Sequence, residues 1–409
     1  HSISPGRFDQ YMYPYYKKDI ESGAITRTAA QELLDCIWVK LNDLNKVRDA
    51  ASAEGFAGYS LFQNLIAGGQ NEEGIDVTND LSFMSIQASM HVFLPQPSLS
   101  VRVWNGTPHE FLIRAAELTR TGIGLPAYYN DEVIIPSLMS RGLTLRDARD
   151  YNIIGCVEPQ KSGKTEGWHD AAFFNMCRPL ELVFSNGMDK GVRIGPATGN
   201  VEDMTTFEQF YDAYKKQMDY AIQLLVNADN AIDMAHAERC PLPFLSSMVD
   251  DCMKVGKTVQ EGGAVYNFTG PQGFGVANMA DSLYSVKTLV YDEKKITMGE
   301  LKEALATNYG KGLGAEDVAA MTAKIANELK EAGKTIGEKE VAAILNTVVA
   351  ASEAPEVKAN GERILKLIEE VPKFGNDIPE VDAFARDVAY TYTEPLQNYK
   401  NPRGGSFQA

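Results

Sequence analysis

The sequence has 409 residues, 44% of them hydrophobic, and a formal net charge of −16 at pH 7. Its length allows two or three ordinary domains or one large barrel-type domain, and its acidic balance argues against a surface for nucleic acid or anionic membrane. No apolar stretch approaches the roughly 20 residues of a membrane span, and no signal peptide opens the chain. The five scattered cysteines form no CxxC pair. We therefore expect a protein of the reducing cytoplasm.

The first part of the chain alternates helical patterns with short apolar strands. Thr26 is a plausible cap for an amphipathic helix over 26–50, and a turn-rich stretch runs from Gly55 to Gly69. Repetition of helix, short strand and loop predicts an α/β barrel with its chemistry at the strand ends. The further predicted elements are a helix over 78–93, a strand over 98–104, a helix that starts at 107–110, a strand over 125–130, helices over 131–141 and 144–149, and a strand over 152–156.

The second part is mainly helical. A long helix with many aromatic residues is predicted over 203–230, and helices and turns continue to about residue 305. Residues 307–360 differ because they are rich in Ala, Lys and Glu, with apolar residues on helical stripes. They predict two or three solvent-exposed helices in a peripheral insertion, with a pair of partner-docking helices as the alternative.

The segment Gly155-Cys156-Val157-Glu158-Pro159 ends an apolar strand. In an extended segment successive side chains alternate faces, so the Cys156 thiol and the Glu158 carboxylate are predicted to lie side by side. This pairing suits a reaction in which sulfur takes a hydrogen atom from carbon while a base takes a proton from a hydroxyl group. The alternative is that Cys156 is a small buried hydrophobic residue.

Two residues that follow the motif are further candidates. Asp170 lies twelve residues after Glu158 and is predicted either to cap a helix that starts near Ala171 or to act with the catalytic pair. His169 would allow a Cys–His thiolate hydrolase. No oxyanion donor or third orienting group accompanies the histidine, and the hydrolase is therefore the weaker interpretation.

The motif Gly155–Pro159 resembles the cysteine finger of the glycyl radical enzymes, the pyruvate formate-lyase-like superfamily. The resemblance covers essentially the whole chain, 1–409, apart from 307–360. Within the superfamily the chain is most similar to the B12-independent glycerol and propane-1,2-diol dehydratases. The stretches that carry the resemblance are 1–5, 63–66, 127–136, 155–160, 164–175, 237–249, 266–278 and 373–381.

The resemblance implies a ten-stranded α/β barrel that encloses two loops, one with the cysteine and one with a glycyl radical. It implies that an activating enzyme with S-adenosylmethionine and an iron–sulfur cluster installs the radical, and that this chain holds no metal or B12. Cys156 would carry a thiyl radical and Glu158 would deprotonate the substrate hydroxyl. Asp170, together with His1 and Ser2, would hold and protonate the departing hydroxyl group, giving an aldehyde and water from a small diol.

The chain departs from the family pattern in three respects. The glycine loop and the upstream third are absent, and we therefore expect a fragment that is inactive alone. The resemblance also implies that the complete protein is a homodimer in the cytoplasm or in a bacterial microcompartment. Phe62 stands where the glycerol enzymes have Tyr, which removes a hydroxyl from the pocket wall. The alternatives are dehydration of hydroxyproline, carbon–sulfur cleavage of isethionate with Arg403 as the sulfonate ligand, and a non-catalytic paralogue.

Overall fold

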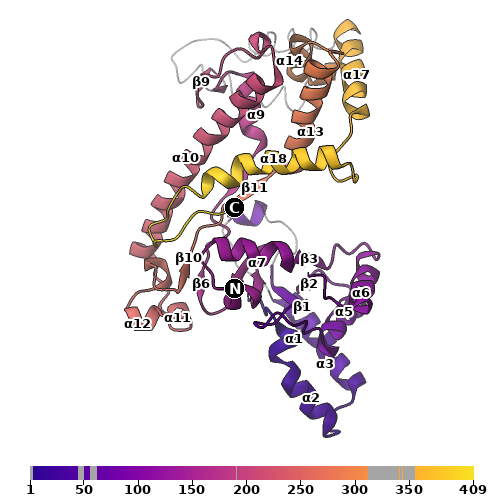
Figure 1. Cartoon of the computed structure of the whole chain (residues 1–409), viewed down its shortest axis with the longest axis vertical. Helices are drawn as coiled ribbons and strands as arrows, with labels where there is room; N and C mark the ends of the chain where they lie inside the picture. Colours follow the sequence, from indigo (N-terminus) through magenta and orange to yellow (C-terminus); the bar gives the residue numbers. More distant parts are fainter. Residues whose placement is uncertain are drawn as a thin grey trace. The chain divides into compact units, whose positions relative to one another are not determined.

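The computed structural model describes residues 3–44, 50–55, 62–189, 191–311, 340, 343 and 355–409 (Figure 1). No helix among these residues is long and apolar enough to cross a membrane. The chain divides into two compact units. The first unit comprises the chain up to Ala172, Asp229–Pro271 and Tyr399–Gln408, and the second comprises Phe173–Ala228, Gln272–Asn398 and Ala409.

The first unit is built on a parallel sheet in the order β1 (Asn64–Gly68), β2 (Ser98–Val103) and β3 (Ala127–Asn130). Helix α5 (Asp80–Val92) connects the first two strands and α6 (His109–Thr119) the next two, as βαβ units require. All five residues of β1 are buried. The prediction of turns from Gly55 to Gly69 is therefore wrong over this strand, because a parallel strand that is buried on both faces shows no alternation of apolar and polar residues.

Helix α3 (Arg27–Asp43) begins as predicted and ends earlier than predicted. The Thr26 side chain accepts a hydrogen bond from the Ala29 amide at 3.2 Å, and Leu44 has left the helical conformation. The side chains of Leu34 and Trp38 are buried in the core beside β1 and β2. The other helices before the sheet are α1 (Phe8–Tyr11), α2 (Tyr13–Glu21) and α4 (Ala50–Gly55).

The two helices predicted after β3 are confirmed, whereas the strand predicted over 152–156 ends two residues early, at Ile154. Helix α7 (Asp131–Ser140) is capped by Asn130, and α8 (Leu145–Arg149) is capped by Thr144. Strand β4 (Tyr151–Ile154) then pairs with β5 (Glu158–Lys161) as an antiparallel hairpin. Strand β6 (Thr165–Glu166) pairs in parallel with β10 (Tyr266–Asn267).

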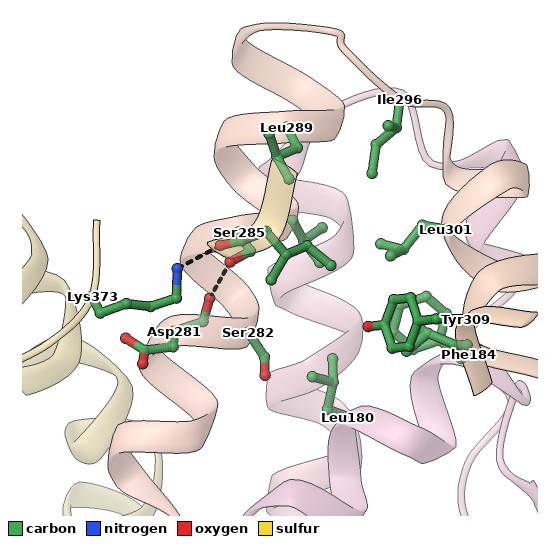
Figure 2. Close-up of a pocket in the computed structure, with 13 residues that line it drawn as sticks. Leu180, Phe184, Asp281, Ser282, Ser285, Leu289, Ile296, Leu301, Tyr309 and Lys373 are labelled. Atoms are coloured by element: carbon green, nitrogen blue, oxygen red, sulfur yellow. Dashed lines mark hydrogen bonds between the residues drawn. The ribbon is translucent and has the colours of Figure 1, made fainter. Parts of the chain in front are cut away.

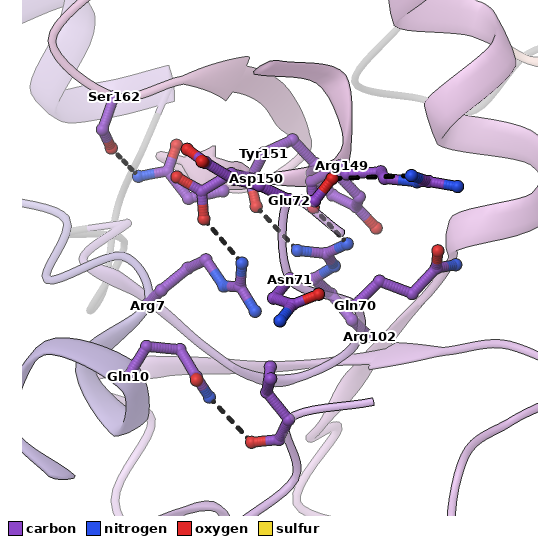
Figure 3. Close-up of polar contacts among 12 residues, drawn as sticks. Arg7, Gln10, Gln70, Asn71, Glu72, Arg102, Arg149, Asp150, Tyr151 and Ser162 are labelled. Carbon is purple, nitrogen blue, oxygen red and sulfur yellow. Dashed lines mark hydrogen bonds and ion pairs between the residues drawn. The ribbon is translucent and has the colours of Figure 1, made fainter. Parts of the chain in front are cut away.

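A polar cluster holds the first residue of β4 in place, and Figure 3 shows its members Arg7, Arg102, Asp150 and Tyr151. Arg102 and Asp131, both fully buried, form two hydrogen bonds of 2.7 and 2.8 Å, and the Tyr151 hydroxyl donates to the same carboxylate. Next to Tyr151, Asp150 pairs with Arg7 at 2.6 Å and also with Lys161. Because breaking a buried ion pair is costly, these contacts fix the base of the hairpin.

In the remaining part of the first unit, the Arg403 side chain links segments that are far apart in the sequence. Its guanidinium donates to Asp233, to the carbonyls of Glu166 and Phe268, and to the Thr269 hydroxyl. The elements of this part are α11 (Pro243–Ser246), α12 (Cys252–Val255), the 3₁₀ turn η2 (Val259–Glu261) and the last third of α10 (Phe207–Arg239).

The second unit is mainly helical. Strand β7 (Phe173–Asn175) pairs in parallel with β11 (Gln272–Phe274), and α13 (Val276–Val286) packs against α18 (Pro379–Leu396). Most of the predicted insertion over 307–360 lies outside the described residues. The other elements are α9 (Cys177–Phe184), β8 (Met188–Asp189), β9 (Val192–Arg193), η1 (Val201–Asp203), the π-helical turn η3 (Lys287–Asp292), α14 (Met298–Ala306), η4 (Asn308–Gly310) and α17 (Pro355–Glu370).

The fold is thus a mixed α/β fold, as predicted. The described residues form one three-stranded sheet and four two-stranded sheets, all of them open. The closure of ten strands into a barrel stays a prediction about the complete protein.

Candidate active site

The predicted site lies on the turn of the β4–β5 hairpin. Ile154 is paired with Glu158 in the strand register, and Gly155, Cys156 and Val157 form the turn between them. Gly155 has φ +62°, and a Cβ atom there would lie 2.7 Å from Glu158 Oε2. Only glycine therefore fits at the first turn position, both for the backbone conformation and for the close approach of the carboxylate.

The turn places the thiol and the carboxylate side by side, as predicted. Cys156 Sγ lies 3.5 Å from Glu158 Oε1. Glu158 Oε2 accepts hydrogen bonds from the amides of Cys156 and Val157 at 2.6 and 2.7 Å. The predicted reason is wrong, because the segment is a turn rather than an extended strand, and the carboxylate folds back over the turn to meet its amides.

The surroundings of Cys156 keep its thiol protonated. Partial burial, the Glu158 charge, the hydrogen bond to Glu158 and the Asp170 charge together raise the pKa of the thiol to about 12. Reactive thiolates occur in electropositive surroundings, where the pKa falls. The surroundings of this sulfur therefore disfavour attack as a thiolate.

Glu158 is only 7% exposed, and burial raises the pKa of its carboxyl group. The two amide hydrogen bonds act in the opposite direction and favour the ionised form, and the Asp170 charge raises the pKa further. A carboxylate with a raised pKa is a stronger proton acceptor once it is ionised.

Asp170 is close enough to the finger for its charge to act on Cys156 and Glu158. The predicted capping role is wrong. Residues 169–172 form turns and bends, strand β7 starts at Phe173, and no helix begins before Cys177. The side chain of Asp170 is exposed and hence accessible to a bound molecule.

Two residues that sequence reasoning missed hold the finger. The Tyr129 hydroxyl donates to the Cys156 carbonyl at 2.7 Å. The Ser4 hydroxyl accepts from the amides of Gly155 and Asn64 at 3.0 and 3.3 Å. In β3, Tyr128 is exposed and Tyr129 is half-buried, but this alternation is seen only in the structure.

Phe62 is linked to the finger through the same serine. The Ser4 hydroxyl lies 3.5 Å from the Phe62 carbonyl oxygen, and Phe62 has the left-handed backbone conformation with φ +54°. A large side chain rarely adopts this conformation, so the local structure must hold it there. The other two predicted substrate ligands, His1 and Ser2, lie outside the described residues.

The Cys–His hydrolase is contradicted by the position of His169. Burial and the charges of Arg141 and Arg403 lower the pKa of its imidazole to about 3, and its ring packs edge-on against Phe268 at 4.9 Å. A thiolate–imidazolium pair would need a low thiol pKa and a raised imidazole pKa. Cys156 and His169 show the reverse of both.

Arg403 is a structural residue and not a sulfonate ligand. All three guanidinium nitrogens donate to protein acceptors, and the side chain is 1% exposed. The prediction that it could bind a substrate sulfonate is therefore wrong. Among the residues that the structure describes, no group of three or more His, Cys, Asp or Glu side chains is arranged to hold a metal ion.

The second unit contains a separate cavity of about 170 Å³ (Figure 2). It is lined mostly by apolar side chains of α9, α13 and α14, among them Leu180, Phe184 and Leu301. The ammonium group of Lys373 donates to the carbonyls of Ile368 and Val371. This cavity contains none of the predicted site residues.

Comparison with known proteins gives one family over the whole length. A sequence model described as pyruvate formate lyase-like matches residues 1–409. The chain is 65% identical, with a TM-score of 0.90, to a solved structure from a study of 1,2-propanediol dehydration in Roseburia inulinivorans. It is 56% identical, with a TM-score of 0.80, to the glycerol-bound B12-independent glycerol dehydratase from Clostridium butyricum.

A curated relative is more distant. The (2S)-3-sulfopropanediol dehydratase of Klebsiella oxytoca is 33% identical over 414 residues, which cover 100% of this chain. The chain spans 49%, 45% and 44% of the lengths of these three proteins, taken in the order given. It therefore corresponds to about half of each similar protein.

Proposed function

Since the chain belongs to the pyruvate formate lyase-like family of glycyl radical enzymes, we propose that the complete protein is a radical lyase that dehydrates a small diol, propane-1,2-diol or glycerol, to an aldehyde. The observation that carries the proposal is the protonated Cys156 thiol at 3.5 Å from the buried Glu158 carboxylate. A hydrogen-atom carrier beside a base is the pair that this reaction needs.

The glycyl radical would supply a one-electron oxidant that takes the hydrogen atom of the Cys156 thiol. The thiol fits this role because its raised pKa keeps the hydrogen on sulfur. Cys156 then removes a hydrogen atom from the substrate carbon, and Glu158 removes the proton of the hydroxyl on that carbon. The resulting ketyl radical expels the neighbouring hydroxyl group, which leaves as water after protonation. Return of the hydrogen atom from Cys156 completes the aldehyde.

We propose that Asp170, His1 and Ser2 hold the departing hydroxyl group of the substrate and help to protonate it. Asp170 is exposed and acts electrostatically on the finger. Ser4, two residues after Ser2, bonds to the Gly155 amide, which supports a place for this segment at the site. Phe62, tied to the same hydroxyl group, would form an apolar part of the pocket wall.

At the level of the complete protein, we propose that the strands close into a ten-stranded barrel, with 1–409 as part of one pyruvate formate lyase-like domain and 307–360 as a peripheral helical insertion. An activating enzyme with S-adenosylmethionine and an iron–sulfur cluster would install the radical. The complete protein would be a homodimer in the cytoplasm or in a microcompartment.

The test is anaerobic activation of the full-length protein, followed by EPR spectroscopy and assays with glycerol, propane-1,2-diol, hydroxyproline and isethionate. We expect a glycine-centred radical and aldehyde from one of the diols. Turnover of hydroxyproline or isethionate, but of neither diol, would make that compound the substrate in place of a diol. A full-length protein that acquires no radical would be a non-catalytic paralogue.

The substitution Cys156→Ala isolates the role of the sulfur. The variant should keep the glycine radical signal and lose all measurable turnover, because the hydrogen-atom carrier is gone. Cys240→Ala, at an exposed cysteine, should leave both unchanged. Retained turnover in Cys156→Ala would end the assignment.

A further inference from the structure

The peptide unit between Cys156 and Val157 is held on both sides. Its carbonyl oxygen accepts a hydrogen bond from the Tyr129 hydroxyl at 2.7 Å, and its N–H donates to Glu158 Oε2 at 2.7 Å. The cis peptide bonds of the described residues precede Pro97 and Pro126, so this unit is trans. In a trans peptide the C=O and N–H point in opposite directions. The phenol and the carboxylate therefore fix one peptide plane from opposite sides.

The phenol of Tyr129 stays protonated at neutral pH and is therefore a hydrogen-bond donor. Burial and the charges of Cys156 and Glu158 raise the pKa of its phenol. The neighbouring Tyr128 lies on the opposite face of β3, is 45% exposed, and shares a hydrogen bond of 2.7 Å with Thr119. Both tyrosine hydroxyl groups form a hydrogen bond, but only that of Tyr129 contacts the finger, so Tyr128 serves as the matched control.

The two hydrogen bonds of this peptide unit reinforce each other. A donor at the carbonyl oxygen polarises the peptide group and makes its N–H a better donor, by roughly 10–30% per bond. The N–H of Val157 stabilises the ionised form of Glu158. The Tyr129 hydroxyl thus acts on the carboxylate through the backbone, without touching it.

We propose that Tyr129 is a positioning residue for the dehydration. Its hydroxyl holds the Cys156–Val157 peptide so that Glu158 Oε2 stays bound to two amides and Oε1 is left to face the thiol and the substrate hydroxyl. The proposal rests on the proposed function of the site. It adds a residue of β3 that the catalytic pair requires.

The test compares Tyr129→Phe and Tyr128→Phe in the activated full-length protein, with rates divided by the radical content from EPR. Loss of one neutral hydrogen bond should lower the kcat of Tyr129→Phe by about fivefold to tenfold. KM should stay within about twofold, because a residue that touches no substrate leaves its binding alone. The acid limb of the pH–rate profile should move to higher pH, since Glu158 binds its proton more tightly. Tyr128→Phe should match the wild type.

A second variant, 3-fluorotyrosine at position 129, retains the ring and the hydroxyl group. Fluorine makes the phenol a stronger donor, so the acid limb should move to lower pH. The role of Tyr129 is overturned by a pH profile that moves in neither variant, by a rise in KM alone, or by loss of the glycine radical in Tyr129→Phe. A wild-type protein that carries the radical and dehydrates nothing would overturn the proposed function, and this proposal with it.

Discussion

The partly buried thiol of Cys156 lies beside the Glu158 carboxylate, and this environment limits the kind of chemistry that its sulfur can perform. Nucleophilic cysteines have a cation, a helix N-terminus or an imidazolium beside them. Here burial, followed by the Glu158 carboxylate and the Asp170 charge, raises the pKa of the thiol to about 12. A sulfur that keeps its hydrogen at neutral pH can still give up that hydrogen as an atom, which is the step that a radical lyase needs.

Replacement of Glu158 by Gln should separate the two roles of this carboxylate. The amide oxygen of glutamine can still accept from the two finger amides, whereas the base and its charge are lost. We expect a radical signal of normal size and a fall in dehydration rate on the order of 10²–10⁴, as for loss of a general base. The pKa of the Cys156 thiol should fall toward its ordinary value, which iodoacetamide labelling across pH 7–10 would detect.

Glu110→Gln, at an exposed position of α6, is the matched control and should change neither rate nor labelling. Full dehydration activity in Glu158→Gln would show that another group removes the proton.

The sequence predicts the proximity of Cys156 and Glu158 well and the residues that support them poorly. A spacing of two residues brings Cys156 and Glu158 together both in a strand and in the observed turn. The predicted proximity is therefore correct although the predicted backbone conformation is wrong. The hydroxyl groups of Tyr129 and Ser4 reach the finger from 27 and 151 residues away. Such contacts depend on tertiary structure, and no local pattern reveals them.

Among the secondary-structure elements, the segment around Arg403 shows how one side chain can join several strand ends. Its guanidinium bonds to the last residue of β6, to the residue after β10 and to Asp233 of α10. Arg403→Lys keeps the charge and loses the planar fork, so buried acceptors lose their donors. We expect a loss of about 2–4 kcal/mol in unfolding free energy, seen as a lower Tm, with the preference among substrates unchanged.

Arg239→Lys, at the exposed end of α10, should leave the Tm unchanged. A normal Tm together with altered substrate preference in Arg403→Lys would show that this arginine binds the substrate.

Element prediction succeeded where caps and amphipathic faces mark the boundaries. Thr26 and Thr144 cap the predicted helices, and α5 lies within its predicted range. Strand β1 was missed because it is buried on both faces and follows glycine-rich sequence. Asp170 was expected at a helix start because aspartate is a frequent cap, but parallel pairing with β11 makes the following residues a strand.

For the molecule as a whole, one buried acid should make stability depend on pH. Asp229 is 2% exposed, and burial with the Asp233 charge raises the pKa of its carboxyl group to about 6. Between this pKa and the unfolded value near 4, the folded state binds more protons than the unfolded state. Stability should therefore rise as the pH falls from 7 to 4. Asp229→Asn should remove this term and raise stability at pH 7 by on the order of 1–3 kcal/mol.

Asp212→Asn is the control on the same helix, because the ion pair with Lys215 lowers the pKa of Asp212. Its small effect should have the opposite sign. Thermal unfolding of both full-length variants between pH 5 and 8 measures the difference, and an unchanged pH dependence in Asp229→Asn would show that Asp229 gains a partner in the complete protein.

The β4–β5 hairpin also bears on how one catalytic unit can serve many substrates. In the proposed reaction, the hydrogen-atom donor, the proton acceptor and the amides that orient the acceptor all lie within residues 155–158, here called the cassette, so their mutual geometry is set within one turn. Changes in the surrounding wall can then alter which molecule is bound while the reagent itself stays constant. Redesign of this protein for a new alcohol should accordingly randomise Phe62 and its surroundings and leave the cassette untouched.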